Sequence, residues 1–470
     1  MKKYSKILLA GTILCTMPGI AFAATPEEME QRLKEMEARL TKFESIMGNV
    51  DQYIEQQVNQ RVEEELAKAA NNTSEKIDQI VSQKIDDQVT EKIASVQPAS
   101  GHEPSKFGKG YIDIPGTNSA IKFGAYVKLD ATYDVDTAFG NDFVSFGAIP
   151  LNGSTNDNQD GEFNMNVRQT RLNITTMTNT EMGDLKVFAE GDFFGTAGTQ
   201  TTTNSHGFRL RHAYGEVGNW LAGQTWTTFQ DTGVYPGSLD LIGGAGTTHL
   251  RQPQIRYTGK LNDATSLAIA IENPSGDISD TSGSSNITEQ FPDLTAALTH
   301  RSDWGHVSLR GMAREIHVED TATGNDESEF GWGLALSGKV KLGEKDSIFG
   351  RYAGGDGIGR YMFDVAGSGA AYETDHLETQ NAHGGHATYR HFWTDELSSN
   401  LIGGYVSIDN DTNIVGTAVN KTIYSAHANL IWQPVPKFKV GVEYMHGERE
   451  LENGTEGDLD RILTSFIYNF

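Results

Sequence analysis

Cysteine is almost absent from this 470-residue sequence, because the single one, Cys15, lies close to the amino end. Leu14 precedes it and is not the small residue that a lipidation site needs, so we do not expect a lipoprotein. The rest of the chain can form no disulfide, hold no thiolate-bound metal and use no cysteine nucleophile. In an oxidising compartment its stability must therefore come from packing and backbone hydrogen bonds.

A long hydrophobic run is also missing. The amino end carries three lysines, a short apolar segment at 7–14 and the small-residue site Ala21-Phe22-Ala23. These features are typical of an export signal, which we place at residues 1–23. No later segment reaches the roughly 20 apolar residues that a membrane helix needs, and the mean hydropathy is −0.44.

Positive charge is scarce, since 38 Lys and Arg stand against 63 Asp and Glu, for a net charge of −25. So acidic a chain is a poor nucleic-acid binder, and we expect no nucleic-acid partner. Proline is sparse, with 12 residues, whereas glycine is abundant, with 51. This composition favours strands and tight turns over a helical globule.

Catalytic motifs are missing as well. No Gly-x-Ser-x-Gly elbow with triad partners occurs, and the glycine-rich segments 243–246 and 354–357 lack the strand-to-helix context of a phosphate loop. His383 and His386 have a spacing that a metal pair could use, but we interpret them as part of a solvated glycine-rich loop. We therefore expect no enzyme, no cofactor and no metal site.

Residues 24–97 are predicted to form an α-helical coiled-coil stalk. Apolar residues recur there in alternating steps of four and three, at Met29, Leu33, Met36, Leu40, Phe43, Met47 and Val50. The later spacing in steps of four unwinds or reverses the supercoil locally. One apolar seam on a charged helix needs a partner, which predicts a dimer or a trimer; a helical spacer without a partner is the alternative. Residues 98–119 form a linker.

From Tyr111 onward the hydrophobic period changes to two, which indicates strands with one apolar and one polar face. Sixteen such segments follow one another, near 120–134, 163–176, 185–194, 207–217, 219–226, 250–259, 264–273, 291–301, 304–317, 328–341, 346–354, 384–393, 397–409, 420–432, 438–449 and 458–470. Aromatic residues near the strand ends are expected to lie at the membrane interfaces: Trp220, Trp226, Tyr257, Trp304, Trp332, Tyr352, Trp393 and Trp432.

The connections between these segments alternate between short turns, such as 218–219, and long loops, such as 227–249. This alternation, with the aromatic last residue Phe470, predicts an all-β transmembrane barrel at 120–470, made of 16 antiparallel up-and-down strands. Both termini, and with them the stalk, would lie on the periplasmic side of a bacterial outer membrane. Unpaired backbone groups are costly in lipid, so the sheet must close, and sixteen strands leave an aqueous channel.

Strand parity predicts which charged side chains face the channel. With Leu172, Leu210 and Tyr214 among the outward residues, the inward set is Lys128, Arg171, Arg209, Arg211, Arg256, Arg310, Arg314, Arg351 and Arg390. The predicted inward carboxylates are Glu190, Asp192 and Glu272. A cluster of inward arginines favours anions; the alternative is that these arginines only pair with the carboxylates and stabilise the wall.

Two arginines do not fit the strand alternation, and one long loop is expected to enter the channel. Arg168 and Arg251 have the wrong parity for their strands, so each marks a bulge, a strand end or a subunit contact. The loop at 227–249 is expected to fold inward and narrow the channel, with Asp231, Tyr235 and Asp240 at the constriction. A loop at the surface is the alternative.

The sequence resembles the DcaP-type porins along essentially the whole mature chain. The resemblance lies in the segments 110–124, 167–172 (Val-Arg-Gln-Thr-Arg-Leu), 209–214 (Arg-Leu-Arg-His-Ala-Tyr), 223–226 (Gly-Gln-Thr-Trp) and 251–256 (Arg-Gln-Pro-Gln-Ile-Arg). It implies a trimer of 16-stranded barrels, a periplasmic helical stalk and uptake of small anions, often dicarboxylates. It also supports channel positions for Arg171, Arg209, Arg211 and Arg256.

We therefore expect a porin for the passive diffusion of small hydrophilic solutes, with a preference for anions such as dicarboxylates. Its expected partners are further copies of itself in a homotrimer, outer-membrane lipid and lipopolysaccharide, the solutes, and the cell wall through the stalk. The competing hypothesis is a structural tether, in which the barrel anchors a stalk that binds the cell wall or a periplasmic partner. A barrel enzyme such as a lipase is disfavoured because no nucleophile motif is present.

Overall fold

The computed structural model describes residues 105–470, apart from positions 141, 158–160, 197–198, 200, 281–284, 321–323, 325 and 374–375. The expected export signal at 1–23, the expected stalk at 24–97 and the first part of the linker lie outside the described residues. No helix within the described part of the chain combines the length and the apolar character needed to cross a bilayer.

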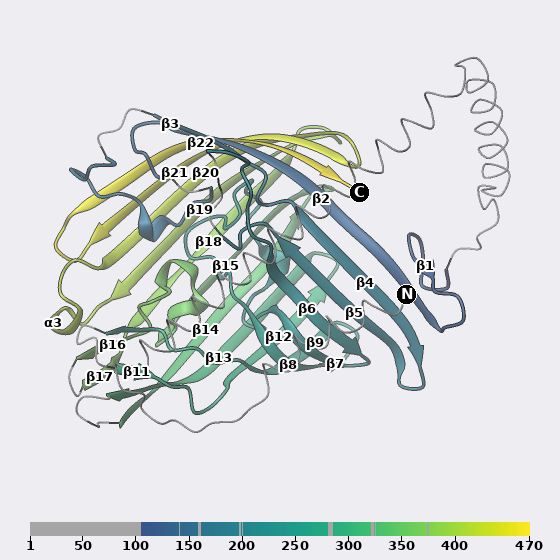
Figure 1. Ribbon diagram of the computed structural model, residues 1–470, viewed down its shortest axis with the longest axis horizontal. Coiled ribbons are helices and arrows are strands. Elements are labelled where there is room, and N and C mark those ends of the chain that lie inside the picture. The colour runs from purple at the N-terminus through teal and green to yellow at the C-terminus, as the bar shows by residue number, and fades with distance from the viewer. Residues whose placement is uncertain are drawn as a thin grey trace, which may run out of the picture. The chain divides into compact units, whose positions relative to one another are not determined.

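Sixteen antiparallel strands in the described residues form a closed barrel (Figure 1). The ring closes because β2 pairs with β22, from Tyr126 opposite Asn469 to Asp134 opposite Arg461. The barrel strands are β2 (Ser119–Asp134), β4 (Arg171–Thr180), β5 (Gly183–Asp192), β6 (Arg209–Val217), β7 (Trp220–Trp226), β8 (Arg251–Lys260), β9 (Thr265–Glu272), β12 (Asp293–Ser302), β13 (Gly305–Asp320), β14 (Asp326–Leu342), β15 (Asp346–Asp356), β18 (Asn381–Phe392), β19 (Leu397–Asp409), β20 (Asn420–Val435), β21 (Phe438–Leu451) and β22 (Glu456–Asn469). The predicted barrel of sixteen antiparallel strands is confirmed.

Alternation of side chains explains why these segments form a barrel wall. On β2, Phe123 is 66 % exposed on the outer face, whereas Lys128 on the other face is only 2 % exposed. On β22, Ile462, Phe466 and Tyr468 are exposed on the outer face. Each strand therefore offers apolar side chains to lipid and polar side chains to the barrel interior, as a membrane barrel requires.

The connections confirm the predicted alternation of short turns and long loops. Short turns such as 218–219 and 343–345 lie at one edge, and long loops such as 193–208, 227–250 and 357–380 lie at the other. β2 begins and β22 ends at the short-turn edge. In an outer-membrane barrel the short turns are periplasmic, so the long loops belong to the outer side.

Smaller strands and helices lie on the barrel rim and in the long loops. β1 (Ile112–Asp113) pairs with the start of β2, and β11 (Ser285–Ile287) pairs with β13. A second sheet joins two long loops and contains β10 (Ile278–Asp280), β16 (Ala370–Glu373) and β17 (His376–Thr379). The helical segments are η1 (Phe146–Ala148), η2 (Thr232–Val234), η3 (Gly359–Tyr361), η4 (Phe363–Val365) and α3 (Thr412–Val415).

One predicted strand is divided in the structure. The segment expected at 163–176 consists of β3 (Glu162–Asn166) and β4, both paired with β2, with residues 167–170 between them outside the ladder. Arg168 lies in this interruption. Of the bulge, the strand end and the subunit contact proposed for Arg168, the structure shows the strand end, since Arg168 lies between β3 and β4.

Among the aromatic residues expected at the membrane interfaces, one prediction is wrong. Trp226 does not point outward; its ring packs against the guanidinium group of Arg251 and the ring of His249. The other members of the group are exposed: Trp220, Tyr257, Trp304, Trp332, Tyr352, Trp393 and Trp432. Trp226 differs because it is the last residue of β7, where the chain turns into the barrel.

Candidate functional site: the barrel interior

The loop at 227–249 lies inside the barrel and is bound to the strands of the far wall. The Leu239 backbone N–H donates to Glu443 Oε2 on β21 at 2.6 Å, and the Ala245 N–H donates to Ser425 Oγ on β20 at 2.9 Å. The Lys128 ammonium on β2 donates to the carbonyl oxygen of Leu239. Most of the second half of the loop, from Leu239 to Thr248, is buried.

Asp231, near the start of this loop, is buried and contacts three side chains of the wall. Its Oδ2 accepts from Ser337 Oγ at 2.7 Å and contacts His306 Nε2 at 2.9 Å, while its Oδ1 lies 3.6 Å from Arg310 Nη2. Burial raises the pKa of Asp231, but Arg310, Ser337 and His306 outweigh burial and bring the pKa below its ordinary value. The carboxylate is therefore charged and anchors the loop to β13 and β14.

Tyr235 and Asp240 organise the loop itself. Asp240 accepts from the backbone N–H of Val144 at 3.1 Å and of Ile242 at 2.9 Å, and burial raises its pKa. The Tyr235 hydroxyl donates to the Leu241 carbonyl at 2.9 Å, and burial raises its pKa. Val144 belongs to the long loop that follows β2, so Asp240 also joins two inward loops.

A third loop, at 357–380, packs against the first. The Tyr361 hydroxyl donates to Asp293 Oδ2 at 2.8 Å and accepts from Gln252 Nε2 at 3.0 Å. The Gly246 N–H donates to Asp364 Oδ2 at 3.1 Å. Phe146, Phe229 and Tyr361, one from each of the three loops, belong to one buried apolar cluster.

The three loops do not cover the inner wall evenly. Inward residues of β13–β15 and β18–β22 are almost all buried, as Arg351 (4 % exposed) illustrates. On β4, β5 and β6 the inward residues Arg171, Glu190 and Arg209 keep partial exposure, and the Arg209 side chain is 33 % exposed. Arg211 and Asp192 are buried behind them. The accessible part of the inner wall is thus the part formed by β4–β6.

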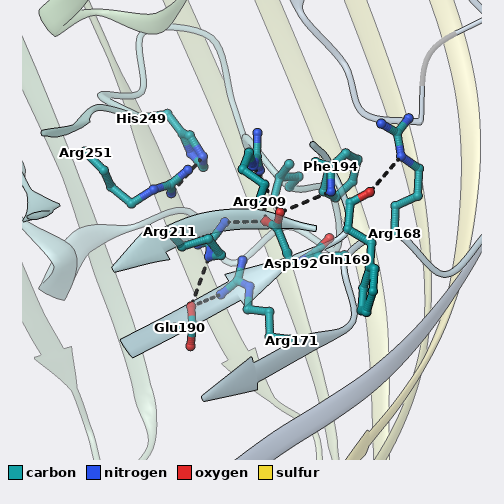
Figure 2. A network of polar contacts seen from close by, with 12 residues as sticks. Arg168, Gln169, Arg171, Glu190, Asp192, Phe194, Arg209, Arg211, His249 and Arg251 are labelled. Atoms are coloured by element: carbon teal, nitrogen blue, oxygen red, sulfur yellow. Dashed lines mark hydrogen bonds and ion pairs between the residues drawn. The ribbon is translucent and has the colours of Figure 1, made fainter. Parts of the chain in front are cut away.

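That accessible wall carries a network of arginines, which Figure 2 shows. Arg209 binds Asp192 through Nε and Nη2 at 3.0 and 2.9 Å, and Arg211 contacts both Asp192 and Glu190 at 2.9 Å. Arg171 lies 3.9 Å from Glu190. Bidentate pairing with carboxylates fixes the guanidinium planes in place.

Arg251 belongs to the same network although its parity is wrong for the β8 strand (Figure 2). It is the first residue of β8, its guanidinium lies 4.5 Å from the Trp226 ring, and its Nη1 lies 3.3 Å from His249 Nε2. Of the alternatives considered for Arg251, the strand end is therefore the correct one. Arg251 was not among the channel residues that strand parity predicted.

The other predicted channel residues fall into two groups. Arg256 on β8 and Arg390 on β18 are partly exposed, and Arg390 Nε donates to Asn400 Oδ1 at 2.8 Å. Arg310 donates to the carbonyl oxygens of Thr228 and Gln230 at 2.6 and 2.7 Å. Arg351 lies behind the Phe229 ring at 5.2 Å. Arg310, Arg351 and Lys128 are thus covered by the inward loop.

Two further expectations are wrong. Tyr214 faces inward, within 3.4 Å of Lys186 Nζ, because a bulge pairs Glu190 with His212 and Gly191 with Leu210 and so reverses the parity after Arg211. His383 and His386 lie in strand β18 and not in a loop. Their odd spacing puts them on opposite faces of that strand, so they cannot share an ion.

Comparisons with known proteins agree with the barrel. Residues 53–470 match the family model described as DcaP outer membrane protein. The outer membrane channel DcaP of Acinetobacter baumannii is similar at 25 % identity, with a TM-score of 0.66 over 78 % of this chain and 99 % of that chain. An anion-selective porin from Comamonas acidovorans shares the fold at 10 % identity, with a TM-score of 0.51 over 75 % of this chain and all of that chain (100 %).

Curated relatives give the same class of protein. The porin Omp2b of Brucella canis is 26 % identical over 254 residues, which are 52 % of this chain. The match spans 61 % of the length of that relative.

Proposed function

The chain belongs to the DcaP outer membrane protein family, and from that premise we propose that this porin favours small anions, dicarboxylates among them. Hydrophilic solutes diffuse passively through its aqueous channel. The passage follows the inner wall of β4–β6, and the loop at 227–249, with Asp231, Tyr235 and Asp240, narrows it. Arg171, Arg209, Arg211, Arg256 and Arg390 supply the positive charge of the channel. Lys128, Arg310 and Arg351, which were also predicted to line it, lie behind the inward loop and hold that loop in place.

The observation that carries the proposal is the surplus of positive charge on the accessible wall. Four guanidinium groups, those of Arg171, Arg209, Arg211 and Arg251, face two carboxylates, those of Glu190 and Asp192. Fixed positive charge beside a narrow aqueous passage raises the local concentration of anions. Pairing with two carboxylates stabilises the wall without cancelling this charge.

The net charge of −25 does not oppose this preference. Charges more than about 8–10 Å from a permeating ion are largely screened at physiological salt. An acidic residue beyond that distance therefore has little influence on an ion beside the arginine network.

We further propose that the porin acts as a homotrimer, with its amino-terminal stalk in the periplasm, lipopolysaccharide around the outer rim and the cell wall within reach of the stalk. The apolar seam predicted between Met29 and Val50 supports self-association, because it needs a partner helix.

Conductance in planar lipid bilayers tests the proposal. With a salt gradient across the bilayer, the reversal potential should give an anion-to-cation permeability ratio above one, and a trimer should close in three equal steps. A ratio at or below one would contradict the anion preference. A correctly folded protein that shows no conductance at all would support the structural tether.

A further inference from the structure

Arg251 differs from the other arginines of the network in having no carboxylate partner. Arg171, Arg209 and Arg211 each have a carboxylate oxygen within 4 Å. Among the residues that the structure describes, no Asp or Glu oxygen comes within that distance of the Arg251 guanidinium group. The surplus charge of the accessible wall is therefore concentrated at Arg251.

The guanidinium group of Arg251 is nevertheless held in a fixed position. One face lies on the indole ring of Trp226 at 4.5 Å, an arrangement that a cation and an aromatic ring favour. Its Nη1 donates to His249 Nε2 at 3.3 Å. Stacking fixes the plane of the group, and the hydrogen bond fixes its rotation within that plane.

The proton positions of this contact follow from chemistry. An arginine only donates, so His249 Nε2 must accept, and the ring proton must lie on Nδ1. His249 Nδ1 then donates to the Tyr235 hydroxyl oxygen, and that hydroxyl donates to the Leu241 carbonyl at 2.9 Å. A chain of hydrogen bonds therefore runs from the inward loop to Arg251.

His249 keeps the neutral form that this chain requires. Burial lowers its pKa well below the ordinary value, and the nearby Arg251, Arg211 and Arg171 lower it further. The arrangement around Arg251 is thus the same across the neutral pH range. The inward loop acts here as a support for an arginine of the wall, in addition to narrowing the channel.

We propose that Arg251 is the residue at which the channel binds the carboxylate group of a passing solute, with Trp226 as its platform and with Tyr235 and His249 as positioning residues. This inference rests on the proposed function. Arg209 and Arg211, already bound to Asp192, supply the surrounding positive potential. The ligand class is the small carboxylates, of which succinate is a suitable probe.

The test measures the block of single-channel chloride current by succinate, with succinamide as the uncharged control. Arg251→Gln should raise the half-blocking succinate concentration about tenfold or more, since hydrogen bonds to charged groups contribute enough for such a factor. Arg251→Lys keeps the charge without the planar stack and should give an intermediate value. Arg301→Gln removes a charge outside the network and should leave the block within about twofold of the parent value.

Tyr235→Phe separates positioning from charge. It should weaken the succinate block while the reversal potential stays that of the parent, because Arg251 keeps its charge and loses its orientation. If Arg251→Gln binds succinate as well as the parent and the parent prefers anions, the inference is wrong and the proposed function stands. If the parent shows no preference for anions, the proposed function itself is wrong.

Discussion

Asp231 shows how a single side chain holds the inward loop against the wall. It is 2 % exposed and is the anionic partner of Arg310, His306 and Ser337. Removing one partner of a buried ion pair leaves the other charge without compensation, which costs far more than the net contribution of the intact pair. The loop should therefore depend on this carboxylate more than on any neutral contact that it makes.

Asp231→Asn should lower the free energy of unfolding by on the order of 3 kcal/mol and give a larger, noisier single-channel current. Ser337→Ala removes one neutral hydrogen bond and should cost only about 1 kcal/mol. Asp395→Asn, at a carboxylate that is 78 % exposed, is the control without effect. Thermal unfolding in detergent and bilayer recordings check both properties. A single-channel current of parental size and parental noise from Asp231→Asn would contradict the role of Asp231 in anchoring the loop.

The arginine network shows which residue positions a sequence can predict. Simple alternation placed Arg171, Arg209 and Arg211 on the inner face, where the structure has them. Alternation gave the wrong face for Tyr214 because a bulge at Arg211, opposite Glu190 and Gly191, reverses the parity of the rest of β6. A bulge inserts one residue and leaves no periodic signal in the sequence. Arg251 was recognisable only by its wrong parity.

Among the structural elements, the long loops contribute the most to the interior and were the least predictable. The barrel strands follow from a two-residue period, which each segment carries in its own residues. The packing of one loop on another depends on contacts between distant positions, such as Asp364 with Gly246. The sequence of a loop predicts its turns, but it does not predict which other loop it packs against.

The packing of the inward loops at 135–161, 227–249 and 357–380 against one another should depend on pH, because Asp364 lies where they meet. Burial raises its pKa to about 6, and the backbone N–H groups of Gly246, Gly147 and Phe146 offset only part of that effect. Since the folded protein holds this proton more tightly than the unfolded chain, the packing of the loops is favoured in acid and loses this contribution as the pH rises through about 6.

Limited proteolysis of the loops measures this pH dependence of their packing. Cleavage within 135–161 and 357–380 should be slower at about pH 5 than at about pH 7.5. Asp364→Asn cannot change its charge, so the difference between the two pH values should disappear in that variant. A variant that kept the parental pH dependence would show that another group is responsible.

At the scale of the whole molecule, the barrel interior has two unequal parts. The loops fill the part next to β13–β15 and β18–β22, while the wall of β4–β6 stays accessible and carries the arginine network. A barrel of sixteen strands is wide enough to need such filling if it is to select among small solutes. The position of the passage therefore decides which charges a solute meets.

Cysteine modification under bilayer recording tests this position most directly, since the sequence beyond Cys15 has no cysteine of its own. Asn173→Cys and Tyr214→Cys place a thiol on the accessible wall, and Ser425→Cys and Ser465→Cys place one behind the loops. A negatively charged thiol reagent should lower the single-channel conductance by about half or more at the first two positions and leave the other two unchanged. Loss of conductance at Ser425→Cys and Ser465→Cys, with none at Asn173→Cys and Tyr214→Cys, would contradict the account.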